Sequence, residues 1–163
     1  MTVLPLSKPA ATRLLALAAV ASIGLALAAC SSAGPTIPLS TGLSARMDQP
    51  NASLDRVQAI AMINAYRATQ GIAQLAPDTG LDGTAQALVN QYASTGIPPK
   101  TPQGLAGMKL SAGYASFAET FSGWRNSPAD AAGLTQPAAK AGIATAFNPN
   151  SNFGVYWVLV LGQ

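Results

Sequence analysis

The sequence predicts an α+β fold in which a small sheet is covered by helices on both faces. The segment Gly154–Gly162, GVYWVLVLG, is apolar at consecutive positions, so both of its faces should be buried. Segments in which apolar residues recur at helical spacing precede it. A strand that is buried on both sides needs helices above and below it, and this requirement sets the fold class.

The first predicted helix begins at Ser53, a residue type that caps helix N-termini, and ends at Gly71. Its apolar stripe also contains Asn64 and Arg67. We expect both to be structural. A helix-borne amide can satisfy backbone groups of a loop, and an arginine can tie the second helix or the C-terminal turn in place.

The second predicted helix begins at Asp78 or Thr79 and ends near Gly96. The stretch TGIPPKTPQGLAG that follows has too many Pro and Gly residues for regular structure and predicts a loop. After it, MKLSAGY predicts a short extended segment.

The third predicted helix begins with a capping box formed by Ser116 and Glu119 and runs to about Arg125, with Trp124 in the core. Ser127 and Pro128 then predict the start of another helix. Two strands are predicted at the end of the chain, at residues 141–147 and 154–162, with the turn NPNSN between them.

The first thirty residues have the pattern of a secretion signal. Lys8 and Arg13 precede an apolar run, Leu14–Leu27, that is short for a membrane span. The run ends in Leu-Ala-Ala-Cys, which resembles the bacterial lipobox, in which the cysteine becomes the lipidated first residue. We therefore predict a signal peptide at residues 1–29 and lipidation of Cys30.

Residues 30–52 are predicted to be the lipidated cysteine and a flexible tether, and residues 53–163 the folded domain. The stretch SSAGPTIPLSTGLSA within 30–52 is rich in Ser, Thr, Gly and Pro and has few large apolar residues. Cys30 is the only cysteine, so no internal disulfide can form and an apolar core must hold the domain together.

The charge of the chain excludes a nucleic-acid partner. Removing Lys8 and Arg13 with the signal reduces the nine basic residues to seven, against six acidic residues, a net charge of +1. No lysine or arginine cluster supplies the cations that phosphate binding requires. Contact with the membrane would depend on the lipid on Cys30 alone.

From about residue 54 to residue 163, the chain resembles the CAP superfamily of cysteine-rich secretory, antigen 5 and pathogenesis-related proteins in its short bacterial form. The resemblance implies an α-β-α sandwich, in agreement with the sheet argument. The opening motif that carries it is Ile63-Asn64, Tyr66-Arg67-Ala68, Gly71, Leu75, Asp78, Leu81 and Ala85. Later matches are Gly113-Tyr114, Trp124, Ser127-Pro128, Gly142-Ile143-Ala144 and Tyr156-Trp157-Val158.

The resemblance implies a central cleft with histidine and glutamate side chains that bind a divalent metal in some members of the family. This chain has no histidine. Leu88, Met108 and Asp130 stand where the family has polar site residues, and we expect these three and Ser127 to line the altered cleft. Leu and Met offer no lone pairs suited to zinc, and Asp130 alone is not a metal site, so we predict no metal and no cofactor.

These observations predict a non-catalytic CAP-like lipoprotein of the bacterial cell envelope that binds a hydrophobic ligand or an envelope protein. The alternative is a metal-dependent or hydrolytic member of the family with rearranged site residues. Ser31 and Ser32 follow Cys30 in place of the aspartate that commonly retains enterobacterial lipoproteins in the inner membrane. We therefore favour the periplasmic face of the outer membrane, or the cell surface, as its location.

Overall fold

The computed structural model of the protein describes residues 41–163. The predictions for the signal peptide, for Cys30 and for the first part of the tether lie outside these residues. In the described part of the chain, no helix is long and apolar enough to cross a membrane.

The central element is a four-stranded sheet with the strand order β1-β3-β4-β2. Strand β4 (Val155–Gly162) lies between β3 (Lys140–Phe147) and β2 (Gly107–Ala112) and is antiparallel to both. The short β1 (Ala76–Pro77) pairs with β3 in parallel. Every residue of β4 is buried, which confirms the predicted central strand.

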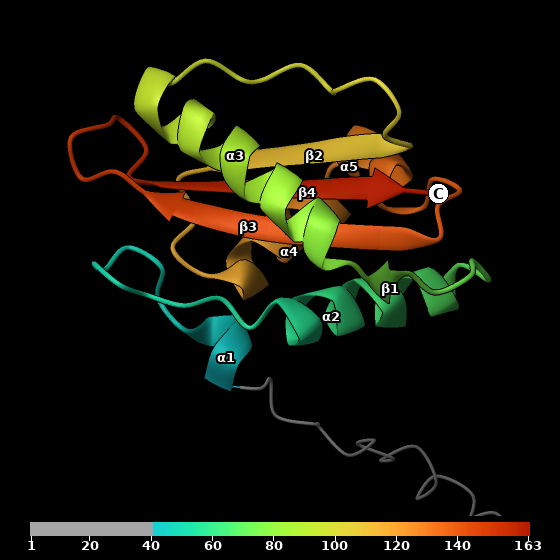
Figure 1. Cartoon of the computed structure of the whole chain (residues 1–163). Helices are drawn as coiled ribbons and strands as arrows, with labels where there is room; N and C mark the ends of the chain where they lie inside the picture. Colours follow the sequence, from blue (N-terminus) through green and yellow to red (C-terminus); the bar gives the residue numbers. More distant parts are fainter. Residues whose placement is uncertain (1–40) are drawn as a thin grey trace, which may run out of the picture. The chain divides into compact units, whose positions relative to one another are not determined.

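Helices cover both faces of the sheet (Figure 1). Helix α3 (Thr79–Thr95) packs on the face that carries Tyr156, Val158 and Val160 of β4. The other face carries Trp157 and Leu159 and packs against α2 (Arg56–Thr69), α4 (Phe117–Asn126) and α5 (Pro128–Leu134). The predicted α+β fold with helices on both faces of a central sheet is confirmed.

Gly142 fixes how closely α3 lies on the sheet. A Cβ atom at this position would lie 2.1 Å from the backbone carbon of Leu81 and 2.2 Å from the backbone nitrogen of Asp82. The first turn of α3 thus rests directly on β3, where only glycine leaves space. Asp82 Oδ1 also accepts a hydrogen bond of 2.9 Å from the Ile143 backbone N–H, which ties the helix to the strand.

The helix ends match the sequence signals, with one correction. Asp78 caps α3, Gly96 ends it in the left-handed conformation, and Ser116 and Glu119 form the predicted capping box of α4. The prediction that Ser53 caps α2 is wrong. Asp55 is the N-cap, because its carboxylate accepts a hydrogen bond of 3.0 Å from the Gln58 N–H and the helix begins only at Arg56.

The predicted boundary between tether and domain at residue 53 is also wrong. A short helix, α1 (Thr41–Ser44), and the segment after it belong to the folded domain. Leu43 and Met47, large apolar residues in an otherwise small and polar stretch, are buried in the core. The Met47 N–H donates to the Ala115 carbonyl at 2.7 Å, so this segment is held beside the start of α4.

Asn64 and Arg67 have the structural roles that the sequence predicted. The amide of Asn64 donates to the Leu75 carbonyl at 2.9 Å and accepts from the Leu75 N–H at 2.8 Å. Arg67 is fully buried and donates to the carbonyls of Ala73, Leu134 and Gln136 at 2.8 to 2.9 Å. Its partners lie in the loop after α2 and at the end of α5, whereas the sequence pointed to the second helix or the C-terminal turn.

We expect Arg67→Met to be strongly destabilising. Methionine fills part of the same space but leaves three carbonyls without their donor, and each unsatisfied buried group costs about 1–3 kcal/mol. The free energy of unfolding should fall by roughly 3 kcal/mol or more, as measured in denaturant melts. The matched control is Arg125→Met on the exposed side of α4, which should change stability by less than about 0.5 kcal/mol. A loss below about 1 kcal/mol for Arg67→Met would contradict the assigned role.

Candidate functional site

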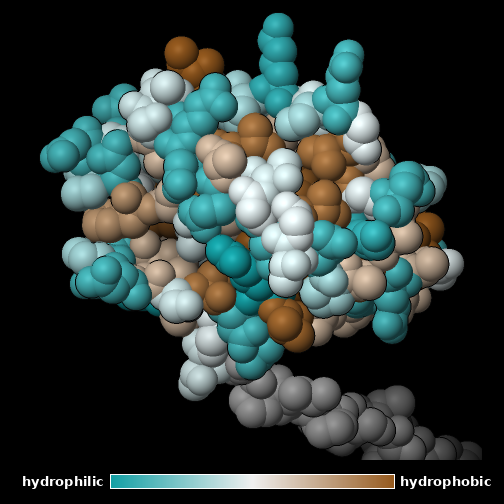
Figure 2. Space-filling model, in the orientation of Figure 1, coloured by the Kyte–Doolittle hydropathy of each residue, from teal (hydrophilic) through white to brown (hydrophobic). Residues whose placement is uncertain are grey.

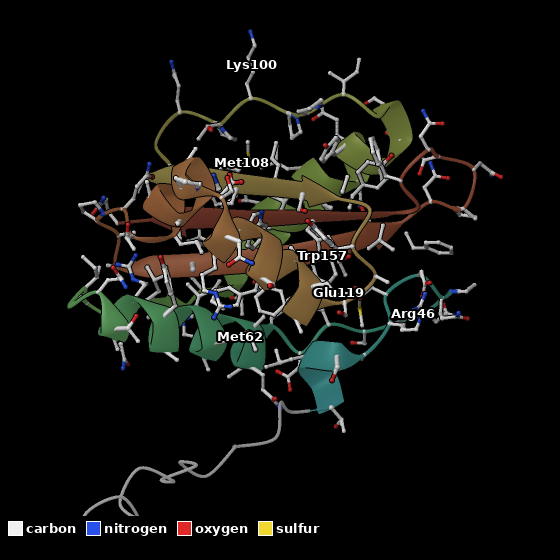
Figure 3. All side chains as sticks on the ribbon, turned by 180° about the vertical axis from the view of Figure 1, so that it is seen from behind. Arg46, Met62, Lys100, Met108, Glu119 and Trp157 are labelled. Atoms are coloured by element: carbon white, nitrogen blue, oxygen red, sulfur yellow. The ribbon has the colours of Figure 1, made fainter. Side chains whose placement is uncertain are left out.

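Leu88 and Met108 both lie on the α3 side of the sheet. Both are partly buried and pack against the cluster formed by Val89, Tyr92 and Val160, among others. Met108 is paired with Val160 across β2 and β4, and it is labelled on β2 in Figure 3. The two positions that the family resemblance aligns with polar site residues are therefore part of an apolar layer.

Asp130 lies on the opposite face of the sheet. It forms an ion pair with Lys109, the residue after Met108, and Lys109 in turn lies against the α5 backbone at Gly133. A Cβ at Gly133 would lie 2.5 Å from the Lys109 Cδ, so the lysine side chain packs directly on the α5 backbone and would have to move if this residue were larger. The Lys109 side chain is mostly buried and Asp130 is about one third exposed.

The electrostatics of this pair favour the ionised carboxylate. Partial burial acts to raise the pKa of the Asp130 carboxyl, but hydrogen bonds from Lys109 and Ser127 and the charge of Lys109 outweigh it, so the pKa lies below its ordinary value. A lowered pKa in the folded state stabilises the fold above the ordinary pKa of the carboxyl, and this contribution is lost as pH falls through the lowered value. At neutral pH, Asp130 is therefore an ionised partner of Lys109.

The prediction that Leu88, Met108, Ser127 and Asp130 line one cleft is wrong. Consecutive strand residues point to opposite faces, so Met108 faces α3 while Lys109 faces α5, which carries Asp130. Ser127 begins α5 with Pro128 at the first helical position, as predicted, but its side chain makes no capping hydrogen bond. A sequence motif does not show this alternation, because the face that each residue occupies depends on the register of β2 with β4.

The residues present do not fit the divalent metal that some family members bind. In residues 41–163, no three His, Cys, Asp or Glu side chains are grouped so that they could hold a metal ion. Leu88 and Met108 offer no suitable ligand atoms, and Asp130 is engaged by Lys109. No chemistry of a family-type metal centre can be derived for this arrangement.

Two surface pockets lie elsewhere, at residues for which the sequence predicts no binding role. The first encloses about 480 Å³ between the start of α2, α3 and β3. Its polar side chains are used within the fold, since Arg56 donates to Gln86 at 3.0 Å and lies 3.9 Å from Asp82. The Gln86 side-chain amide in turn donates a hydrogen bond to the Thr145 carbonyl at 3.4 Å. Arg56 and Gln86 therefore cover part of the unpaired edge of β3.

The second pocket, called here the loop pocket, encloses about 250 Å³ between the last turn of α3 and the loop 148–154 that joins β3 to β4. Its lining includes Asn148, Asn150, Asn152, Phe153 and Tyr156. The segment NPNSNF was visible in the sequence but was interpreted only as a turn. The signal that could have identified it is the combination of three asparagines with a large aromatic residue in an exposed loop.

The sheet with α3 on one face and α2, α4 and α5 on the other defines a CAP-type domain. The model of the cysteine-rich secretory protein family, CAP, matches residues 60–161. The chain belongs to this family. No curated protein sequence matches the chain.

Solved structures share the fold at low sequence identity. An extracellular protein of Bacillus anthracis that contains an SCP domain superposes with a TM-score of 0.53 and 15% identity over 66% of this chain. The match covers 40% of the Bacillus protein, so this chain spans less than half of its length. The structure of MpPR-1i, soaked with selenourea, gives a TM-score of 0.51 and 18% identity over 63% of this chain and 85% of the other. These identities support the fold alone.

Proposed function

We propose that this chain is an exported, lipid-anchored CAP-domain protein of the bacterial cell envelope that binds a partner protein and carries out no catalysis. Export is supported by the signal-like segment 1–29 and by the fold shared with an extracellular bacterial protein. Anchoring is supported by the lipobox-like sequence that ends in Cys30. The outer membrane or the cell surface is the proposed location.

The observation that carries the proposal is the apolar character of the altered family site. Leu88 and Met108 belong to a row of partly exposed apolar side chains between α3 and β2, which we call the α3–β2 seam and which comprises Leu88, Leu105, Met108, Leu110 and Ala112. Figure 2 shows apolar residues reaching the surface on this side of the domain. Partly exposed apolar rows of this kind are typical of contact surfaces.

A protein partner suits this seam better than a small hydrophobic ligand. Small-molecule sites are concave and surround most of the ligand, whereas neither of the two pockets described above includes Leu88 or Met108. A second protein can cover a surface of this kind without entering a cavity. Methionine adapts its shape to different partners, so Met108 suits such a contact.

The hydrolytic or metal-dependent alternative has less support. The polar side chains that the family uses are replaced at positions 88 and 108, and Asp130 is held by Lys109 on the other side of the sheet. No nucleophile and base are brought together at these positions.

The anchor is tested by metabolic labelling with a radioactive or alkyne-bearing fatty acid. We expect the wild-type chain to incorporate the label and Cys30→Ser to lose it, because the thiol is the only group in the lipobox-like sequence that can be lipidated. The variant should also be released from the membrane or remain uncleaved. A wild-type chain that takes up no label would show that it is not a lipoprotein, whatever its partner.

The partner contact is tested by placing a photoreactive phenylalanine derivative at position 88 in intact cells. The control position is Ala87, an exposed neighbour on the same helix. We expect a saturable adduct of one defined mass from position 88 that is absent from position 87 and is lost when Met108→Lys is added, because a charge in the seam opposes apolar contact. Equal adducts from both positions, or none from position 88, would contradict the proposal.

A further inference from the structure

The loop pocket has features of a binding site that the fold itself does not require. It shares no residue with the α3–β2 seam, so the inference drawn from it does not rest on the proposed partner contact. Its floor and walls come from the end of α3, from the loop 148–153 and from Tyr156. None of its lining side chains is charged.

The loop that forms the pocket is held in shape by its own hydrogen bonds. Asn148 donates to the Ala93 carbonyl at 2.7 Å, which fastens the loop to α3, and accepts from the Asn150 N–H at 3.1 Å. The Ser151 hydroxyl donates to the Asn148 carbonyl at 2.8 Å and accepts from the Gly154 N–H at 3.1 Å. A pre-shaped loop loses little conformational freedom when a ligand binds.

Two side-chain amides of the loop make no hydrogen bond within the described part of the chain. They belong to Asn150 and Asn152, and both line the pocket. Each side-chain amide offers two N–H donors and a carbonyl acceptor, so each can bind a pair of neighbouring hydroxyl groups. Such a pattern favours a ligand that is rich in hydroxyls and neutral.

Phe153 adds an exposed aromatic ring to the same pocket. Its side chain is 53% exposed, one of four large hydrophobic side chains that are exposed in residues 41–163. The ring stands edge-on to Tyr156 with a centroid distance of 6.1 Å and an interplanar angle of 89°, and Tyr156 meets Tyr92 at 4.8 Å. Phe153 therefore packs against Tyr156, which packs against Tyr92, and part of the Phe153 ring remains exposed to solvent.

We propose that the loop pocket binds a neutral saccharide, with one sugar ring packed on Phe153 and its hydroxyls hydrogen-bonded by Asn150 and Asn152. A sugar ring presents C–H groups on its faces and hydroxyls at its rim, which matches an aromatic surface bordered by amides. The absence of charge in the lining disfavours phosphate, carboxylate and ammonium ligands. The volume of about 250 Å³ suits one ring of a longer chain, with neighbouring rings in solvent.

The test is a titration of the full chain with a panel of neutral trisaccharides built from glucose, galactose, mannose and N-acetylglucosamine. Binding is monitored through the backbone amide chemical shifts in NMR spectra. At least one trisaccharide should bind, with shifts concentrated in residues 148–156. Phe153→Ala should weaken this binding at least tenfold, and Asn150→Ala with Asn152→Ala should do the same. The control Val57→Ala removes another exposed apolar side chain and should leave the affinity unchanged.

Phe153 is an exposed residue, so its replacement should leave the domain folded, and thermal melts of each variant check this. The proposal is overturned if no member of the panel binds, if shifts map outside the loop pocket, or if Phe153→Ala leaves the affinity unaltered. In a parallel experiment, binding of the wild-type chain and of Phe153→Ala to phosphatidylcholine–phosphatidylglycerol vesicles is measured. Loss of vesicle binding in Phe153→Ala without any saccharide binding would identify the ring as a membrane contact and also overturn the proposal.

Discussion

The buried Arg67 guanidinium is the interaction on which the arrangement of one face of the domain depends. Among residues 41–163, the Arg67 guanidinium has no carboxylate partner. Burial lowers its pKa below the ordinary value, but the group remains charged. The carbonyls of Ala73, Leu134 and Gln136 balance that charge. One side chain therefore holds the loop that leads from α2 to β1 against the end of α5. Because the charge cannot be buried without these three acceptors, the two segments are held in one relative position.

The other face depends on close approach of the backbone. Gly142 allows the first turn of α3 to rest on β3, and Asp82 and Gln86 of that helix hydrogen-bond the outer edge of the same strand. With α3 held there, Leu88 and Met108 both pack against the same apolar cluster. A polar site at these positions would need space between the helix and the sheet, and the close packing leaves apolar side chains as the residues that fit. The same geometry ends α3 beside the loop 148–154 and so creates the loop pocket.

Much of the fold was predictable because its signals are local. The unbroken apolar run of β4, the capping box at Ser116 and the glycine at position 96 each specify their own structure. The start of the domain was missed because Leu43 and Met47 gain their burial from contacts with residues far along the chain. The candidate cleft was mispredicted for a different reason. A shift of one residue in a strand reverses the face, so the direction of Met108 and Lys109 depends on the register with β4, which the motif does not reveal.

We propose that apolar packing at Leu88 and Met108, together with the position of Asp130 on the other face of the sheet, has replaced a metal-binding family site by a binding surface. The most direct measurement is the metal content of the purified full chain, combined with calorimetric titration with Zn²⁺ and Ca²⁺. We expect no stoichiometric metal and no saturable heat with either ion. One equivalent of zinc or calcium, retained through purification and lost in Asp130→Ala, would contradict it.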